Sequence, residues 1–431
     1  MPTSDWLEPA HWPRDLRDAF AEAPRDGCWR LALSGGLDSV FLLYCLTALA
    51  RKENRSVTAV HVNHGLQPEA AEWEKHCRTL CHSLGVGFLS QRVDLDPKAG
   101  DLEASARRAR YDVFETVVAK GDALFMAHHG DDQAETVLLR LLRGSGVRGL
   151  AGMPAMRALG AGWLCRPLLT LTRERIAWLA RQWRLHWCED GSNQELRFDR
   201  NYLRHRVMPV LRQRWPETVS GFNRSARHCR EADQLLGDMA SQDAESVDCA
   251  GAVAVNRLAW LGFARRKQLM RHLLWQNGLP VPGEQRLGNG LEALINTPGD
   301  GSPELTGPGY RIRRYRDCLW VLPDLPGVPV TAERQWHPRD RLDWWGTTLR
   351  ACSVAGEGLA GVCDGGFTVT RRRGGERIRP GAGQPQRTLK KWLQECGVPP
   401  WERQYLPLIW SGGVLVAVAD YWVAPHWRAR P

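Results

Sequence analysis

The sequence predicts an α/β protein. Its N-terminal part is expected to be a doubly wound parallel sheet, followed by a mostly helical middle domain and a small α+β C-terminal domain. Three observations predict this: strand-like and helix-like runs alternate up to about residue 215, long polar helical runs follow, and short β-like runs with many turns come after a proline-rich stretch. At ~150 residues per domain, a chain of 431 residues has about two to four domains. We expect them at 1–215, 217–325 and 335–431.

The first domain shows regular alternation along the chain. We expect strands at 29–33, 56–62, 86–93 and 122–126, and helices at 38–50, 68–84, 101–118 and 131–142. In a parallel sheet the carboxyl ends of the strands share one edge, where ligands bind. Polar clusters follow three of these strands, at 34–36, 63–64 and 128–129. An active site is therefore expected at this edge.

The later domains give weaker signals. Helices are expected at 217–239 and 258–276, strands around 310–322, a linker at 323–329 and a further helix near 389–396. Ser411-Gly412-Gly413 lies between two apolar runs, and we interpret it as a hairpin turn.

The charge is distinctly positive. Lys and Arg number 58 against 48 Asp and Glu, giving a net charge of +10. This favours a polyanionic partner such as RNA, DNA or an anionic membrane, although only seven of the cations are lysine, so coding bias is an alternative. The longest relevant apolar run, 40–50, is shorter than the ~20 residues of a membrane span, and no secretory signal opens the chain. We expect a cytoplasmic protein without membrane association, either monomer or homodimer.

Twelve cysteines occur at irregular spacings, without a Cys-x-x-Cys pair. Cys77 and Cys81 are four residues apart, but no second pair supports a zinc or iron–sulfur site. We expect reduced thiols that fill the core.

The strongest motif is Ser34-Gly35-Gly36-Leu37-Asp38-Ser39, which follows a strand and opens a helix. Its glycines let backbone N–H groups approach an anion, and the helix N-terminus adds partial positive charge. A carboxylate beside phosphates needs a bridging cation, so Asp38 implies Mg²⁺. The alternative is a tight turn with a capping Asp.

This motif resembles the pyrophosphate loop of the N-type ATP pyrophosphatases, which cleave ATP to AMP and pyrophosphate. The resemblance implies ATP binding by the six residues of the loop, Ser34, Gly35, Gly36, Leu37, Asp38 and Ser39. The superfamily includes GMP synthetases, argininosuccinate synthetases, tRNA 2-thiolation enzymes and tRNA(Ile)-lysidine synthetases, and the loop alone does not choose among them.

Other segments resemble the lysidine synthetases. These are His61-Val62-Asn63-His64-Gly65-Leu66, the stretch 103–111 with Glu103, Arg107 and Arg110 on one helical face, and Ala127-His128-His129-Gly130-Asp131-Asp132-Gln133-Ala134-Glu135-Thr136. A surface ladder of ion pairs at 103–110 and a helix cap at Asp131 are the plain alternatives. Segments 142–150, 166–169, 189–193 and 200–211 continue the resemblance.

The resemblance extends to the C-terminus. Between 371 and 391 lie eight cations and one acid, followed by Pro399-Pro400-Trp401. A cationic patch beside aromatic side chains suits phosphate contacts and base stacking. Contacts with tRNA are expected here from Arg371, Arg372, Arg373, Arg377, Arg387, Lys390 and Lys391.

The resemblance implies a ligase. ATP would adenylate the C2 oxygen of the wobble cytidine in the isoleucine tRNA with a CAU anticodon, and the ε-amine of free L-lysine would then displace AMP. Asp38 and Asp132 are the expected catalytic residues and Mg²⁺ ligands. Contacts with lysine or tRNA are expected from Glu103, Arg107, Arg110, His129, Arg143, Arg200 and Arg204.

Two alternatives stay open. A tRNA 2-thiolation enzyme shares the loop but generally depends on cysteine pairs, which are missing here. A non-catalytic RNA-binding scaffold would keep the fold without the activity, although the intact Asp38 and Asp132 argue against it.

Overall fold

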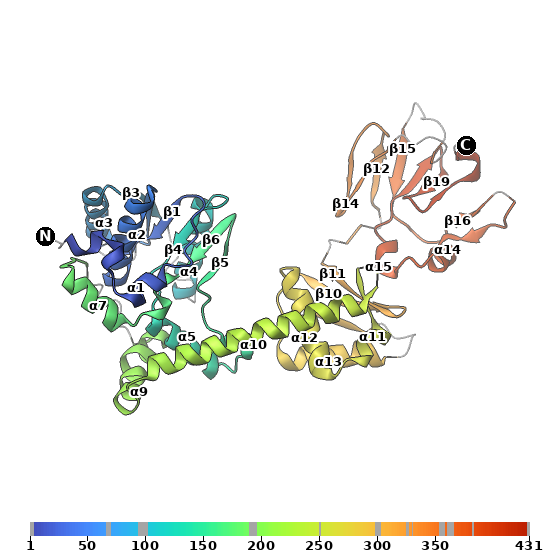
Figure 1. Cartoon of the computed structure of the whole chain (residues 1–431). Coiled ribbons are helices and arrows are strands. Elements are labelled where there is room, and N and C mark those ends of the chain that lie inside the picture. Colours follow the sequence, from blue (N-terminus) through green and yellow to red (C-terminus); the bar gives the residue numbers. More distant parts are fainter. Residues whose placement is uncertain are drawn as a thin grey trace. The chain divides into compact units, whose positions relative to one another are not determined.

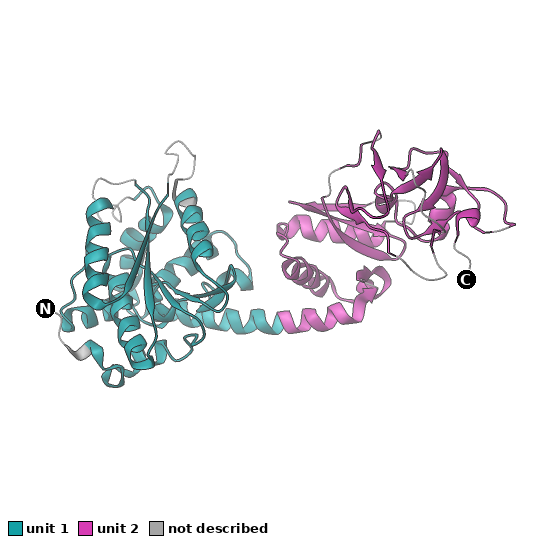
Figure 2. Cartoon of the chain, turned by 90° about the horizontal axis from the view of Figure 1, so that it is seen from above, with its two compact units in different colours: residues 1–236 teal, residues 237–431 magenta. Residues whose placement is uncertain are grey.

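The structure is a computed structural model, and it divides into two compact units, residues 1–236 and 237–431 (Figure 2). The boundary falls inside one helix, α10 (Thr218–Val247). The described residues are 4–65, 70–93, 102–188, 196–249, 251–297, 303–324, 327–329, 331–352, 358–359, 366–381 and 383–428.

Unit 1 contains a six-stranded sheet in the order β3-β2-β1-β4-β6-β5 (Figure 1). Five strands are parallel: β1 (Trp29–Ala32), β2 (Val57–Asn63), β3 (Gly87–Arg92), β4 (Ala123–Phe125) and β6 (Gly162–Cys165). The edge strand β5 (Met156–Leu159) pairs antiparallel with β6 through a tight hairpin.

Both faces of this sheet are covered. Successive side chains of a strand point to opposite faces, and in β4 Ala123 and Phe125 belong to one apolar cluster while Leu124 belongs to another. The first cluster includes side chains of α2 (Leu37–Glu53), α3 (Ala70–Leu84) and α7 (Arg173–Gln182), and the second includes side chains of α4 (Leu102–Val117). The doubly wound sheet that the sequence predicts is thus confirmed.

The remaining elements of unit 1 are short, apart from α5 (Gly130–Leu142). The chain begins with η1 (Ser4–Leu7), η2 (Pro9–His11) and α1 (Arg14–Ala19), and later passes through α6 (Val147–Leu150) and η3 (Pro167–Thr170). Near the end of the unit come α8 (Asp199–Tyr202), the π-helical turn η5 (Leu203–Val207) and α9 (Met208–Arg214).

The first part of unit 2 packs helices against an antiparallel sheet. The helices are α11 (Val255–Trp260), α12 (Phe263–Gln276) and α13 (Glu284–Asn296). The sheet, in the order β7-β8-β11-β10-β9, contains β7 (Asp248–Cys249), β8 (Ala252–Ala254), β9 (Glu304–Gly307), β10 (Tyr310–Tyr315) and β11 (Cys318–Pro323). The single helix predicted at 258–276 is wrong, since Leu261 is extended and Gly262 caps a new helix, α12.

The last part of unit 2 is an antiparallel sheet with short helices. Its strands are β12 (Glu333–Trp336), β15 (Phe367–Thr370), β18 (Leu408–Ser411), β19 (Val414–Val418) and β20 (Trp422–Val423), accompanied by the hairpins β13 (Leu342–Trp344)–β14 (Thr347–Leu349) and β16 (Arg377–Ile378)–β17 (Arg387–Thr388). The helices are α14 (Leu389–Glu395), α15 (Pro400–Arg403) and η6 (Pro425–Trp427). The turn predicted at 411–413 joins β18 to β19 and is confirmed. Within the described ranges, no helix has the length and apolar character needed to cross a membrane.

Candidate active site

The glycine-rich loop lies at the carboxyl end of β1, directly before α2. The Ser39 hydroxyl sits at its centre, donating to the Gly36 carbonyl (3.0 Å) and accepting from the N–H groups of Ser34 and Gly35 (3.2 Å each). Gly35 has φ +90°. These bonds fix the conformation of the loop. The N–H groups of Leu37 and Asp38, at the start of α2, have no intrahelical partner and are free to bind an anion.

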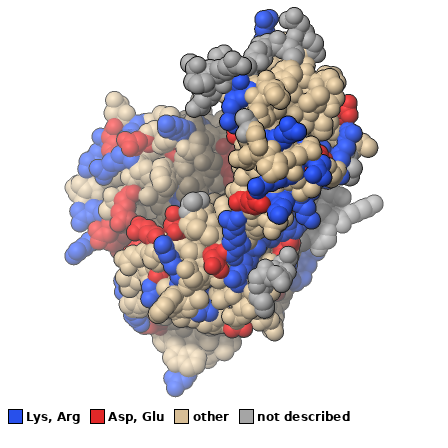
Figure 3. Space-filling view, turned by 90° about the vertical axis from the view of Figure 1, so that its right-hand side faces the viewer, with Lys and Arg blue, Asp and Glu red and all other residues tan. Residues whose placement is uncertain are grey.

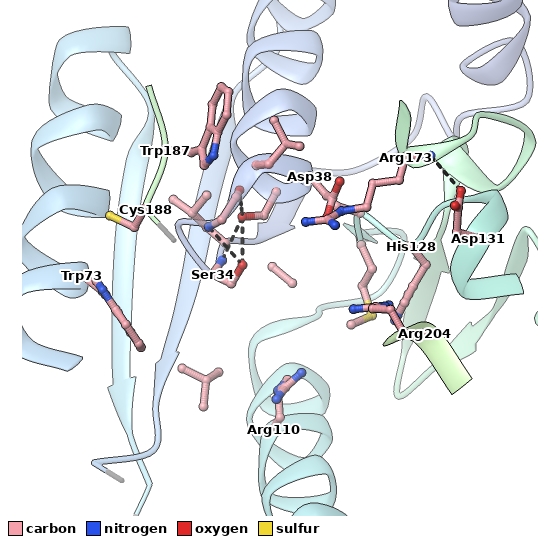
Figure 4. A pocket seen from close by; sticks show the side chains of 18 of the residues that line it. Ser34, Asp38, Trp73, Arg110, His128, Asp131, Arg173, Trp187, Cys188 and Arg204 are labelled. Carbon is pink, nitrogen blue, oxygen red and sulfur yellow. Dashed lines mark hydrogen bonds and ion pairs between the residues drawn. The ribbon is translucent and has the colours of Figure 1, made fainter. Parts of the chain in front are cut away.

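The loop opens onto a cavity of about 1040 Å³. In the view of Figure 4, Trp73, Trp187 and Cys188 lie on one side of the loop, whereas Arg173 and Arg204 lie on the other. The cavity therefore has a partly aromatic wall and a charged wall. This combination suits a nucleotide, whose base is flat and whose phosphates are anionic.

Asp38 is the loop's acidic member and lies at the charged wall. Its Oδ2 is 3.7 Å from the His129 Nε2 and 4.0 Å from the Arg173 Nε. Its Oδ1 is buried and accepts no hydrogen bond from any described residue. A buried carboxylate oxygen without a partner is costly, so this atom is suited to a cation.

A complete protein cage for a metal ion is missing. Within the described ranges, no group of three or more His, Cys, Asp and Glu side chains is arranged to hold one. Mg²⁺ in nucleotide sites usually takes one or two carboxylates together with phosphate oxygens and water. The donor set around Asp38 fits that pattern.

The N-terminus of α5 holds a reciprocal cap. The Asp132 Oδ2 accepts from the His129 N–H (3.0 Å), and the His129 Nδ1 accepts from the Asp132 N–H (3.4 Å). Burial alone would lower the pKa of His129, but the charges of Asp132, Asp38 and Asp131 outweigh it and raise the pKa above its ordinary value. The cap also holds the ring beside Asp38, with the His129 Nε2 3.7 Å from the Asp38 Oδ2.

Four charged side chains form a cluster at the charged wall, and two of them, Glu135 and Arg204, line the cavity. Arg200 donates to Asp132 (2.9 Å) and Glu135 (3.0 Å), and Arg204 donates to Asp132 (2.8 Å) and Glu135 (2.7 Å). The acids are three residues apart on α5 and the arginines four apart on α8 and η5, so each pair shares a helical face. Although burial opposes it, the charges of His129, Arg200 and Arg204 hold the pKa of Asp132 well below its usual range.

His128 and His64 contribute neutral rings to the cavity lining. The pKa of His128 is lowered to about 3, chiefly by burial and further by nearby arginines, and its Nδ1 accepts from the Arg166 Nε (3.2 Å). The pKa of His64 is lowered to about 4 by burial and by the charge of Arg110. Both rings can therefore offer a hydrogen bond near neutral pH without adding charge.

Asp131 serves the scaffold. Its Oδ2 accepts from the N–H of Arg173 at the start of α7 (2.7 Å), and its Oδ1 pairs with Arg212 of α9. Asp131 is thus not the helix cap that the sequence offered as an alternative, because His129 caps α5 and Thr172 caps α7.

The structure places the predicted contact residues unequally. Arg110 and Arg204 line the cavity, whereas Arg107 does not and is exposed, lying over the Tyr111 ring. Arg143 is exposed and pairs with Asp199 (3.3 Å), also outside the lining. Glu103 belongs to α4, but its side chain lies outside the described part.

Several residues that line the cavity were not predicted from the sequence. Trp73, Trp187 and Arg173 reach the cavity from α3, from the segment after α7 and from the start of α7. No local motif marks them. Glu135 could have been predicted from the sequence as a site residue, because it lies three residues after Asp132 on a predicted helix and so shares its face.

The predicted cations of the C-terminal part differ in their partners. Arg372, Arg373 and Arg387 pair with Glu376, Glu333 and Glu395, and Arg371 donates to the Val328 carbonyl. Arg377, Lys390 and Lys391 are exposed and pair with no acid in the described ranges. Figure 3 shows many Lys and Arg side chains among fewer acids on the face it presents.

Three domain families match the chain in sequence. They are a PP-loop domain over residues 11–211, a TilS substrate binding domain over 254–320 and a TilS substrate C-terminal domain over 367–431. The first covers the loop and every residue of the cavity lining except Arg212. The other two lie in unit 2.

Full-length relatives match as well. The tRNA(Ile)-lysidine synthase of Alkalilimnicola ehrlichii is 44% identical over 405 residues, covering 93% of this chain and 91% of that protein. The tRNA(Ile)-lysidine synthases of Coxiella burnetii and Pseudomonas aeruginosa are 38% and 39% identical, covering 93% and 94% of this chain and 90% and 92% of their own lengths. With this identity over almost its whole length, the chain belongs to the tRNA(Ile)-lysidine synthase family.

Proposed function

We propose that the protein ligates free L-lysine to C2 of the wobble cytidine of the isoleucine tRNA with a CAU anticodon, releasing AMP and pyrophosphate from ATP. The observation that carries this proposal is that the loop at Ser34–Ser39 and the charged residues Glu135 and Arg204 face one cavity. One cavity thus combines a loop suited to the phosphates of ATP with a charged wall suited to a second substrate.

The first step is adenylation. The C2 oxygen of the cytidine attacks the α-phosphorus of ATP, a new P–O bond forms, and the bond to pyrophosphate breaks. The chain supports this step with the N–H groups of Leu37 and Asp38 at the start of α2, which meet the leaving phosphates. The Ser39 hydroxyl keeps the loop in the required curve.

Asp38 is the proposed ligand of Mg²⁺ through its unpartnered Oδ1. A bound Mg²⁺ supplies positive charge that offsets the charge of the phosphates. We also propose Asp132 as a ligand, but both of its oxygens already accept hydrogen bonds from the protein. Such a role requires the guanidinium of Arg200 or Arg204 to turn away from Asp132.

The second step forms the carbon–nitrogen bond. The ε-amine of lysine attacks C2, and the C2 oxygen leaves as part of AMP. The ammonium form, whose pKa is ~10.4, must first lose a proton to solvent water. Asp132 is a weak base, because its pKa lies well below the usual range. Its proposed role is therefore that of a metal ligand and not of a base.

Lysine is proposed to bind near α4. Arg110 of this helix lines the cavity and suits the α-carboxylate of lysine or a phosphate of the tRNA, and Arg204 lines the same cavity. From the same motif we propose Glu103 for the ammonium group. Arg107 and Arg143, which are exposed, are proposed to contact tRNA outside the cavity.

The two buried cysteines of α3 argue against sulfur transfer at their positions. Burial raises the pKa of Cys77 and of Cys81 to about 12. A thiolate is the reactive form, so both thiols are unreactive near neutral pH. This disfavours a 2-thiolation chemistry at these positions.

Unit 2 is proposed to bind the tRNA, with Arg377, Lys390 and Lys391 contacting phosphates. A net charge of +10 supports a polyanionic substrate. Because ATP and tRNA are the proposed substrates, we place the reaction in the cytoplasm.

The test is incorporation of labelled lysine into acid-insoluble RNA, with Mg²⁺-ATP and the isoleucine tRNA carrying a CAU anticodon. Asp38→Asn should lower turnover on the order of 10²- to 10³-fold, because it removes the charge of the proposed metal ligand. Asp15→Asn is the matched control, since Asp15 pairs with Arg175 and lies outside the cavity lining. AMP formation without lysine incorporation by the unaltered protein would refute lysine as the nucleophile.

A further inference from the structure

Trp260 is unusually exposed for a large aromatic residue. It ends α11 with 91% of its surface exposed, more than any other exposed large apolar side chain in the described part. Phe263, three residues later, is 43% exposed. Tryptophan is enriched at contact sites, because its indole is large and apolar but has a polar N–H.

The turn that carries Trp260 is held firmly. Leu258 is fully buried in the core of this part, and Leu261 packs against that core. Arg266 of α12 donates to the carbonyls of Leu258 (3.2 Å), Ala259 and Leu261 (2.7 Å). The indole therefore projects from a fixed backbone, which lowers the entropy lost when a partner binds.

The charge around this turn suits an anion. Residues 251–283 contain five cations and no acid. Arg265 pairs with Asp243, and Lys267 and Arg271 pair with Glu284. Arg257 is exposed and its guanidinium donates to the carbonyls of Ser246 and Asp248, while no carboxylate in the described part pairs with it.

We propose that Trp260 is a stacking platform for an unpaired base of the tRNA, with Arg257 near an adjacent phosphate. The inference rests on the proposed function, and the match of residues 254–320 to a substrate binding domain supports the choice of occupant. A base has an apolar π face that an exposed indole can cover, and single-stranded nucleotides are recognised by such stacking. The neighbouring positive charge favours RNA over an apolar protein surface.

The experiment measures binding of the isoleucine tRNA with a CAU anticodon to the full chain without ATP, over a series of salt concentrations. Trp260→Ala should weaken binding about five- to tenfold, whereas Trp260→Phe should stay within about threefold of the unaltered protein. The slope of log affinity against log salt should stay unchanged for Trp260→Ala, because stacking releases no counterions. Arg257→Gln should reduce that slope by about 0.7–0.9.

Trp178→Ala is the matched control. Trp178 is a half-exposed tryptophan on α7 in unit 1, where Arg175 lies over its ring, and its replacement should leave tRNA affinity unchanged. Circular dichroism melts verify that each variant is folded. In steady-state assays, Trp260→Ala should raise the KM for tRNA and leave the KM for ATP and kcat unaltered.

Two results would overturn the proposal. One is a folded Trp260→Ala protein whose tRNA affinity stays within about twofold of the unaltered protein. The other is unchanged tRNA affinity with an altered sedimentation coefficient, which would assign Trp260 to a contact between copies of the chain. Failure of the proposed function gives a different pattern, because tRNA would still bind but no lysine would be incorporated by the unaltered protein.

Discussion

At the scale of single residues, the two glycines of the loop differ in whether their backbone conformation requires glycine. Gly35 has φ +90°, and a Cβ there would lie 3.0 Å from the Cys77 Sγ. Gly36 has φ −78°, and its Cβ would lie 3.7 Å from the nearest atom, an ordinary contact. Gly35→Ala should destabilise unit 1 by about 1–2 kcal/mol, because a left-handed backbone strains any residue with a Cβ.

The matched variant is Gly36→Ala, which should unfold close to the temperature of the unaltered protein. For a unit of this size, 1 kcal/mol corresponds to about 2–4 °C, which a melting experiment on both variants resolves. Equal melting temperatures for the two variants would show that the curve of the loop does not depend on Gly35.

His128 makes the stability of unit 1 depend on pH. Its pKa is about 3 when folded and 6.5 ordinarily, so between these values the unfolded chain binds a proton that the folded chain does not. Acidification from pH 7 to 4.5 should therefore cost about 2–3 kcal/mol from this group alone. His129 has the opposite effect. Its pKa is raised in the folded state, so it stabilises the fold at low pH, and this stabilisation is lost as the pH rises through the raised pKa.

His128→Gln isolates this contribution, because a Gln side-chain oxygen can still accept from Arg166. The loss of stability on acidification should shrink by about 2 kcal/mol in the variant. Urea titrations at both pH values measure it, with the transition of unit 1 identified by its shift on addition of ATP. An identical pH dependence in both proteins would mean that His128 is protonated in the folded state.

At the scale of elements, the buried charge cluster joins α5 to α8 and η5. Glu135→Gln removes one carboxylate from two arginines that stay partly buried, so we expect a loss of about 2–3 kcal/mol in stability and of most lysine incorporation. Asp199→Asn breaks an exposed ion pair with Arg143 and should cost below ~1 kcal/mol. Similar losses for the two variants would show that the cluster does not hold these helices together.

The elements also show what the sequence could predict. Strand and helix periodicity located β1 to β4 and α2 to α5 within a few residues, because each element carries its own pattern. The antiparallel β5 was missed, since its four residues, half of them exposed, give no buried periodicity. The break at Gly262 was also missed, because apolar positions continue at helical spacing on both sides of it.

Some residues of the site could likewise be predicted from the sequence, and others could not. The loop at Ser34–Ser39 and the pair Asp132 and Glu135 come from short continuous motifs, so the sequence contains them. Trp73 and Trp187 reach the cavity only because the sheet brings distant segments to one edge. Arg107 shares a helical face with Arg110 by spacing, yet it packs on Tyr111 outside the lining, which spacing alone does not decide.

At the scale of the whole molecule, the proposed tasks fall in different units: ATP binds in unit 1, and the free cations of the C-terminal part lie in unit 2. Replacing Arg377, Lys390 and Lys391 by Gln should therefore raise the KM for tRNA and leave ATP binding unaltered. The slope of log tRNA affinity against log salt should fall by about two to three, since each lost phosphate contact removes about 0.7–0.9.

Two paired arginines of the same part provide a matched control for the loss of positive charge. Arg373 and Arg387 already pair with Glu333 and Glu395, so part of their charge is neutralised before any tRNA binds. Replacing these two by Gln should change the salt slope by less per cation than replacing the unpaired three. Equal changes per cation would mean that overall positive charge, and not the position of the unpaired cations, governs binding. A reduced slope confined to the unpaired set would instead locate phosphate contacts on β16 and α14.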